Sequence, residues 1–262
     1  LANENGGSGW DGSWGNLTSS PNVNSPYLTN DNTSLAPPPN PFPVIGDRLN
    51  KSVNFTGHNN FSTIGRRFAA AGSGLNMGVD GTLYVSFSWT KTDGGTSGDN
   101  FEFTLNGSSS NTLATRAGVT SGENLFLNAS TSVVSGDQYG AISQGATYFT
   151  VLKLTASAAG QDVVQASNFL STPSTSEPGA WDKTANLTLA DTVNVNQFRL
   201  IMGLNARAQF DELRVGTSWQ DVAVYSTASV PESSAALFVG LAGIVGGGVA
   251  WKRRGVRRAD SA

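Results

Sequence analysis

Acidic side chains are the first candidates for chemistry in this sequence, because an enzyme that hydrolyses a glycosidic bond needs two carboxyl groups facing one site. Asp211 and Glu212 are adjacent, so on a strand their side chains would point to opposite faces of the sheet. Glu102 stands alone between two phenylalanines. We therefore expect these acids to lie on solvated faces or to hold loops through Arg207 and Arg214. The sequence predicts no catalytic residues and no enzymatic activity.

A metal site would have to be built from oxygen ligands, because the chain has no cysteine and only one histidine, His58. Asp93, Asp99 and Asn100 share one Gly-rich loop, and their carboxylate and amide oxygens suit calcium. The loop lacks the ligand spacing of an EF-hand, and a solvated hairpin loop would have the same composition. Calcium at these three residues is therefore one alternative, and a chain without any cofactor is the other.

Tryptophan side chains are the candidates for contact with a carbohydrate, since an exposed indole ring can stack on a sugar. Trp10 and Trp14 lie in a Gly-rich segment near the start of the sequence, and Trp181 and Trp219 lie much later. Each of them could equally anchor a loop or fill a core. We name Trp10 and Trp14 as the candidate carbohydrate contacts.

Any such site must be positioned by β-strands, because Gly contributes 31 residues and charged residues make up only 13% of the chain, a composition that disfavours helices. Apolar residues alternate with other residues between positions 83 and 89 and again between 101 and 105, which predicts strands with one buried face. Similar runs continue to about residue 225 without a linker and indicate one antiparallel sandwich domain. The residues predicted to point into the core are Leu83, Val85, Phe87, Trp89, Phe101, Phe103 and Leu105.

The last 33 residues differ from the rest of the chain in composition. An uncharged run over residues 234–251 is followed by closely spaced cations. As a helix this run is long enough to cross a bilayer, and basic residues stay on the cytoplasmic side. We therefore predict an anchor in the inner membrane with the domain outside it. The residues that would set this topology are Trp251, Lys252, Arg253, Arg254, Arg257 and Arg258.

The distribution of charge argues against a nucleic acid as partner. The formal net charge is −3, and five of the 16 Lys and Arg residues lie in the basic cluster after Trp251. The body of the chain is therefore mildly acidic, and an acidic surface repels a phosphate backbone.

Three features of the C-terminus together resemble the PEP-CTERM sorting signal of bacterial exoproteins: the motif Val230-Pro231-Glu232-Ser233, the short apolar span and the terminal basic cluster. The family motif is Pro-Glu-Pro, and Ser233 departs from it at the third position. The resemblance implies insertion into the inner membrane, cleavage near Pro231 and Glu232 by an exosortase-type membrane protease, and release to the cell surface or extracellular space. A mature protein that keeps Trp251 and the basic cluster would contradict cleavage and leave a permanent anchor.

The sequence Phe-Asp-Glu-Leu-Arg, which starts at Phe210, resembles the final strand of concanavalin-like, laminin-G-like domains, and the segment from Asn5 to Trp14 resembles the head of such domains in PEP-CTERM exoproteins. This implies an all-β, antiparallel jelly-roll sandwich with a C-terminal transmembrane helix. The expected role is structural or adhesive at the cell surface or in the extracellular matrix, with exopolysaccharide as a partner. The alternative is a carbohydrate-binding module, or a polysaccharide hydrolase or lyase, on the same fold.

These predictions divide the chain into five segments. Residues 1–49 form the N-terminal part of the sandwich domain with Pro/Asn/Ser-rich loops, and residues 50–225 form its core. Residues 226–233 are a linker with the Pro-Glu motif, residues 234–251 the transmembrane sorting helix and residues 252–262 the basic cytoplasmic tail. An exported chain needs a signal peptide. The start at Leu1, which has none, is either that of a mature form or that of a fragment, and we interpret it as a fragment or trimmed form.

Overall fold

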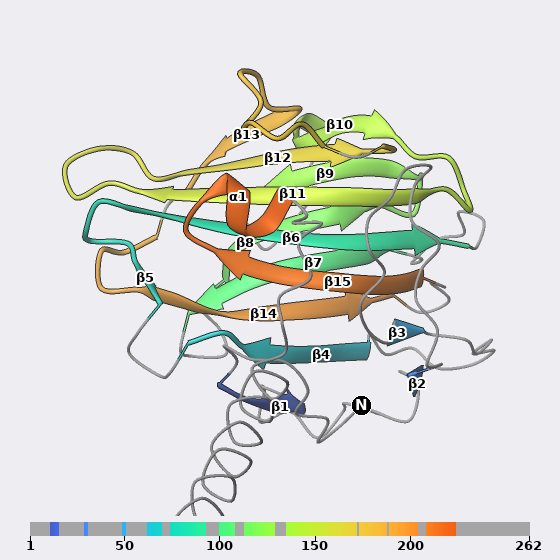
Figure 1. Ribbon diagram of the computed structural model, residues 1–262, viewed down its shortest axis with the longest axis horizontal. Helices are drawn as coiled ribbons and strands as arrows, with labels where there is room; N and C mark the ends of the chain where they lie inside the picture. The colour runs from blue at the N-terminus through green and yellow to red at the C-terminus, as the bar shows by residue number, and fades with distance from the viewer. Residues whose placement is uncertain are drawn as a thin grey trace, which may run out of the picture. The chain divides into compact units, whose positions relative to one another are not determined.

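The chain folds as a sandwich of two antiparallel sheets (Figure 1). This confirms the predicted all-β class. The computed structural model describes residues 11–15, 29–30, 49–50, 62–69, 74–92, 100–107, 113–128, 135–171, 173–187, 189–203 and 208–223. The chain divides into two compact units, Leu1–Tyr225 and Ser226–Ala262, and the described residues all belong to the first.

Sheet A has the strand order β1–β4–β14–β7–β8–β9–β10, and β5 pairs with β14 beside this path. Neighbours in this order are often distant in the sequence, since β14 lies between β4 and β7. In sheet order its strands are β1 (Asp11–Gly15), β4 (Ser62–Arg67), β14 (Asn194–Met202), β7 (Phe101–Gly107), β8 (Leu113–Val119), β9 (Asn124–Asn128) and β10 (Gln138–Ala141), with β5 (Leu75–Asn76) beside them.

Sheet B has the strand order β13–β12–β11–β6–β15–β3–β2. Its central strands β6 and β11 pair from one end to the other, with Gly81 opposite Ala156 and Thr90 opposite Thr147. The strands are β13 (Lys183–Asn186), β12 (Val163–Phe169), β11 (Thr147–Ala156), β6 (Gly81–Lys91), β15 (Ala208–Gly216), β3 (Leu49–Asn50) and β2 (Thr29–Asn30). The described helices are short: a 3-10 turn at Ser135–Asp137 and α1 at Trp219–Ala223.

The core lies between the two sheets, and the seven residues predicted for it are all buried. Phe87 of β6 is fully buried, and its ring centroid lies 3.8 Å from that of Phe103 on β7 in the opposite sheet. Phe198 and Phe210 complete an aromatic cluster around Phe87, with centroid distances of 5.7 Å each. The alternation in the sequence therefore identified the interior faces of β6 and β7 correctly.

The opposite face of β6 is also buried, which the sequence did not predict. Ser86 and Ser88 are 0% and 5% exposed, although they lie on the face turned away from the core. The cause is α1, which packs over this side of sheet B (Figure 1) and whose Val222 carbonyl accepts a hydrogen bond of 2.8 Å from the Ser86 hydroxyl. A second apolar cluster forms here from Tyr84, Phe149, Val151, Trp219, Val222 and Ala223.

Within the described ranges, no helix is long and apolar enough to span a membrane. The motif at residues 230–233, the expected transmembrane helix at 234–251 and the basic tail at 252–262 all lie outside the described residues.

Candidate functional site

The loop expected to hold calcium lies mostly outside the described part of the chain. Asp93 and Asp99 are not among the described residues, and Asn100 is. The Asn100 side chain donates a hydrogen bond of 2.6 Å from Nδ2 to Glu102 Oε1. Among the residues whose placement is described, no group of three His, Cys, Asp or Glu side chains could hold a metal ion.

The tryptophans named as candidate carbohydrate contacts are described only in part. Trp10 lies outside the described residues, and only the backbone of Trp14 is described, in β1. Trp219 is 3% exposed and donates from Nε1 to the Ser174 carbonyl at 3.0 Å, so it anchors a loop. Trp181 is half-buried and faces Trp219 edge-on at 6.0 Å.

The outer face of sheet A, which is turned away from sheet B, carries a row of polar side chains. The register places Arg199 of β14 opposite Thr104 of β7, Thr104 opposite Arg116 of β8, and Arg116 opposite Asn128 of β9. Their neighbours along each strand, such as Phe103 and Leu200, point into the core, so these four point outward. We call Arg199, Thr104, Arg116 and Asn128 the polar row. Thr104, Asn128 and Arg199 are buried, at 1%, 3% and 5% exposed.

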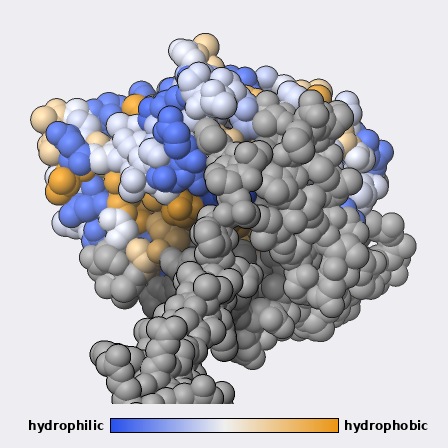
Figure 2. All heavy atoms as spheres, in the orientation of Figure 1, coloured by the Kyte–Doolittle hydropathy of each residue, from blue (hydrophilic) through white to orange (hydrophobic). Residues whose placement is uncertain are grey.

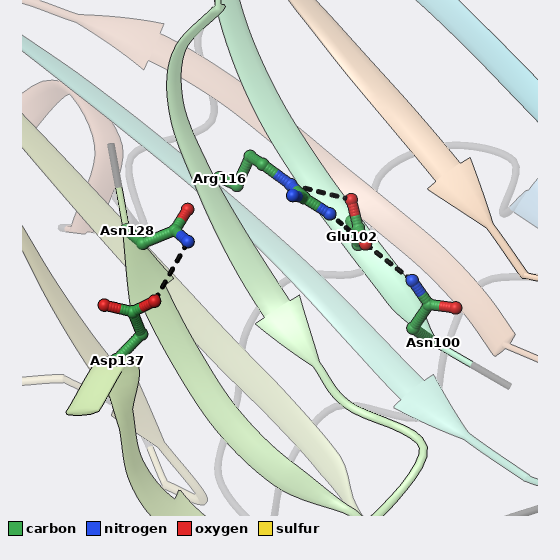
Figure 3. A network of polar contacts seen from close by, with 5 residues as sticks. All are labelled: Asn100, Glu102, Arg116, Asn128 and Asp137. Carbon is green, nitrogen blue, oxygen red and sulfur yellow. Dashed lines mark hydrogen bonds and ion pairs between the residues drawn. The ribbon is translucent and has the colours of Figure 1, made fainter. Parts of the chain in front are cut away.

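Glu102 lies beside this row and forms an ion pair with Arg116 (Figure 3). Arg116 Nη2 donates to Glu102 Oε1 at 2.5 Å, and Arg116 Nε donates to Oε2 at 3.1 Å, so the pair is bidentate. Glu102 is 3% exposed, which corrects the prediction that it lies on a solvated face. A carboxylate can be buried here because Arg116 and Asn100 satisfy it.

The other members of the polar row are also held by neighbouring side chains. Asn128 Nδ2 donates to Asp137 Oδ2 at 3.0 Å, as Figure 3 shows. The Thr104 hydroxyl donates to Asn106 Oδ1 at 2.8 Å. Hydrogen bonds of this kind fix the orientation of polar groups before any ligand arrives, which reduces the entropy cost of binding.

Two arginines lie at the β14 end of the row. Arg199 Nη2 donates to Gln197 Oε1 at 3.0 Å, and Arg67 of β4 lies opposite Gln197 on the same face. Burial, and after it the positive charge of Arg67, lower the pKa of Arg199 from its ordinary value. The positive charge of Arg67 therefore acts on Arg199 across this part of the sheet.

Sequence reasoning missed Arg67, Arg116, Gln197 and Arg199. A usable signal was present in Gln197-Phe198-Arg199, where two planar polar side chains alternate with a core residue and so must share one face of a strand. Arg116 gave a weaker signal, because the sequence does not show which strand pairs with β8.

A second cluster of titratable groups lies on the outer face of sheet B, the side that carries α1. Glu177 accepts hydrogen bonds from Tyr84 Oη at 2.7 Å and from Lys153 Nζ at 2.6 Å. Lys153 Nζ also lies 5.6 Å from the centre of the Tyr84 ring and 6.0 Å from that of Trp181. The described surface seen from this side is mixed, with blue and pale residues around an orange, hydrophobic patch (Figure 2). The cluster joins the segment that contains Glu177 and Trp181 to strands β6 and β11.

This cluster predicts a loss of stability in acid. Burial alone favours the protonated form of Glu177, but the hydrogen bonds from Lys153 and Tyr84 outweigh it and lower the pKa of Glu177 below its ordinary value of 4.5. The stabilisation is therefore present above pH 4.5 and is lost as the pH falls through the lowered pKa. Because both partners are partly exposed, we expect about 0.5–1 kcal/mol.

Thermal unfolding of the native chain and of Glu177→Gln checks this expectation. Glu177→Gln should be less stable than the native chain at neutral pH, and the difference should be smaller at an acid pH below the lowered pKa of Glu177. The matched control is Asp191→Asn, which removes an exposed carboxylate elsewhere. A difference for Glu177→Gln that is the same at both pH values would contradict the ion pair as its cause.

Comparison with known proteins shows similarity in structure. No protein-family model and no curated protein matches the chain. An endo-β-1,4-glucuronan lyase from the fungus Trichoderma reesei is 15% identical, with 77% of this chain and 94% of that chain covered and a TM-score of 0.48. An alginate lyase from Pseudomonas aeruginosa is 13% identical (66% and 83% covered, TM-score 0.42), and lectin II from Ulex europaeus is 11% identical (64% and 86% covered, TM-score 0.39).

The prediction that the chain has no enzymatic activity is wrong in the light of these neighbours. Besides the two lyases, a β-glucanase catalytic domain from Podospora anserina is among the similar structures. The prediction rested on a search for two carboxylates on one strand. Such a search misses a site assembled from several strands, as the polar row is. At these identities the similarity itself concerns the fold.

Proposed function

We propose that the chain is a polysaccharide-active protein that binds an extended glycan across the outer face of sheet A and acts on it as an enzyme. The observation that carries this proposal is the polar row. It crosses four neighbouring strands, β14, β7, β8 and β9. With strands about 4.8 Å apart, the row extends over about 14 Å, which is long enough for a short run of sugar residues.

The side chains of the row suit a sugar polymer chemically. Guanidinium, amide and hydroxyl groups can donate hydrogen bonds to ring hydroxyls, and Thr104 and Asn128 can also accept them. Their mutual hydrogen bonds orient them in advance, with Thr104 held by Asn106 and Asn128 held by Asp137. A row of such groups can bind several consecutive sugars weakly and still hold the polymer firmly, because the contacts act together.

Glycan cleavage also needs a group that moves a proton, and Glu102 is poorly placed for that role. Its carboxylate already accepts hydrogen bonds from Arg116 and Asn100. Both carboxylate oxygens are therefore already occupied by hydrogen-bond donors of the protein, and a substrate would have to displace one of them to reach the carboxylate. We therefore assign Glu102 to positioning Arg116.

The experiment that tests the proposal offers the full chain a panel of purified polysaccharides. Binding is measured by affinity electrophoresis. Cleavage is measured by the release of reducing ends and by the ultraviolet absorbance of the unsaturated sugar that an eliminase forms. We expect at least one polysaccharide to be bound, and Thr104→Val to lower the affinity for it by up to about tenfold, since it loses one hydrogen-bonding group and keeps its size.

The matched control for Thr104→Val is Thr155→Val, the same change on the outer face of sheet B. It should leave binding unchanged. Equal effects of the two variants would contradict a site on sheet A, and a chain that binds no member of the panel would overturn the proposed function.

The export and sorting predicted from residues 230–262 are a separate proposal. Its support is the sequence pattern of the motif, the apolar span and the basic cluster. An exported protein that acts on polysaccharides would meet them at the cell surface, so the two proposals are compatible.

A further inference from the structure

Trp181 is an aromatic side chain that the proposed site on sheet A does not use. It lies in the connection between β12 and β13, beside the outer face of sheet B, and it is half-buried. It packs against the second apolar cluster, where its ring meets Trp219 edge-on at 6.0 Å. A partly exposed indole ring offers a ligand a flat apolar surface.

Three neighbours fix the orientation of this ring. Trp181 donates a side-chain hydrogen bond to Glu177, and the indole N–H is the only donor of its side chain. Lys153 Nζ lies over the ring, 6.0 Å from its centre. Trp219, which meets the ring edge-on, is itself held by the Ser174 carbonyl. A ring that is already held in place loses little conformational entropy when a ligand stacks on it.

A row of polar side chains leads from the ring toward the edge of sheet B. The register places Lys153 of β11 opposite Gln165 of β12, and Gln165 opposite Thr184 of β13. Their neighbours along the strands, such as Leu154 and Val164, lie in the core, so these three side chains point outward. Lys153 and Gln165 are half-buried and Thr184 is exposed. Unlike the polar row on sheet A, this row is therefore accessible to solvent at its β13 end.

The charges around the ring cancel in pairs. Lys153 Nζ donates to Glu177 at 2.6 Å. Asp182 and Lys183, which follow Trp181 in the sequence, carry opposite charges. A surface without an excess of either charge attracts neither a polyanion nor a polycation. The ring, the amide and the hydroxyl group that lie beside these charges match the apolar faces and the hydroxyl groups of a neutral sugar.

We propose that Trp181, Gln165 and Thr184 form a second carbohydrate-binding surface, on the outer face of sheet B, and that its ligand is an uncharged glycan. A sugar ring stacks on the face of Trp181 that is turned away from Lys153, and the hydroxyl groups of the glycan exchange hydrogen bonds with Gln165 and Thr184. With strands about 4.8 Å apart, the row from Lys153 to Thr184 spans about 10 Å, which a short run of sugar residues covers.

This surface goes beyond the proposed function, because it lies on the opposite side of the sandwich from the polar row. It holds a glycan without acting on it. Its contribution to binding is therefore separable from that of sheet A by substitutions on one face at a time.

The test measures binding of the full chain to four uncharged polysaccharides, laminarin, dextran, galactomannan and hydroxyethyl cellulose, by affinity electrophoresis. Trp181→Ala removes the ring, Trp181→Phe keeps an aromatic face, and Thr184→Val removes a hydroxyl group at nearly constant size. The matched control for Thr184→Val is Thr155→Val, since Thr155 points from the same face of sheet B, two residues after Lys153. Circular dichroism shows that each variant is folded.

We expect at least one of these polysaccharides to be bound, and Trp181→Ala to weaken that binding by about threefold to tenfold. Trp181→Phe should keep most of the affinity, because a phenyl ring can still stack. Thr184→Val should weaken binding by about threefold, and Thr155→Val should leave it unchanged. If Trp181→Ala does not fold, the exposed Thr184→Val decides the result.

The outcomes that contradict this surface differ from those that contradict the site on sheet A. Native affinity in Trp181→Ala would overturn the inference, whereas weaker binding in Thr104→Val would leave the proposed function standing. Equal losses in Trp181→Phe and Trp181→Ala would assign Trp181 a structural role and overturn stacking. Equal effects of Thr184→Val and Thr155→Val would also overturn the inference. So would failure of all four polysaccharides to bind, and only failure of the wider panel as well would overturn the proposed function.

Discussion

Replacement of Phe87 by alanine is expected to lower the free energy of unfolding by about 3–5 kcal/mol. Phe87 is fully buried at the centre of the sandwich, and its ring meets Phe103, Phe198 and Phe210. These partners come from both sheets, so the cavity would lie at the interface between them. Since neither sheet can collapse into the space without moving the other, we expect a loss near the upper end of this range.

Urea unfolding followed by intrinsic fluorescence measures this effect. The matched control is Leu170→Ala, which truncates a large apolar side chain that is 52% exposed, and it should cost less than about 0.5 kcal/mol. If Phe87→Ala were as stable as the control, the assignment of Phe87 to the core between the sheets would be wrong.

The second large effect is expected at Gly118, the last residue but one of β8. A Cβ atom added there would lie 2.0 Å from the Phe101 carbonyl oxygen and 2.8 Å from the Glu102 Cα. Both contacts are with the backbone of β7, so no side chain can rotate away, and the strands themselves must move apart. Gly118→Ala should therefore destabilise the domain by about 3 kcal/mol or more.

Gly179→Ala is the matched control, because no atom lies within 4 Å of the added Cβ and the change should be nearly neutral. Both variants are compared by thermal unfolding. Gly118→Ala should also weaken the proposed glycan binding even where it stays folded, since Gly118 lies opposite Glu102 and two residues after Arg116 on the same strand. A Gly118→Ala protein with native stability would show that β7 and β8 are not as close as described.

The alternation of apolar and other residues in β6 and β7 was sufficient to predict which side chains face the core. Every second residue of a strand lies on the same face, and this does not depend on which strand it pairs with. Leu83 to Trp89 and Phe101 to Leu105 are buried as expected. The pairing partners could not be predicted in the same way. The neighbour of β7 in sheet A is β14, about ninety residues later, and nothing local in the sequence of either strand specifies that contact.

The sequence alone could not predict the candidate site, for the same reason. Arg199, Thr104 and Arg116 form one row only because of the register of three strands. Glu102 was expected in solvent because an isolated acid between two phenylalanines has no visible partner. Arg116 supplies one from the next strand. The burial of Ser86 could not be predicted for a different reason. It depends on α1, a five-residue helix that follows the last strand.

The position of α1 has a consequence for how the domain would be presented on a surface. Because α1 packs against the outer face of sheet B, the chain leaves the last described residue, Ala223, on the side opposite the polar row. An attachment point on α1 would lie on that side, with the thickness of two sheets, about 10 Å between their centres, separating it from the outer face of sheet A. Attaching the protein through an added residue on α1 should therefore leave the glycan binding proposed for sheet A intact, whereas attachment through an added residue on β4 or β14 should obstruct it.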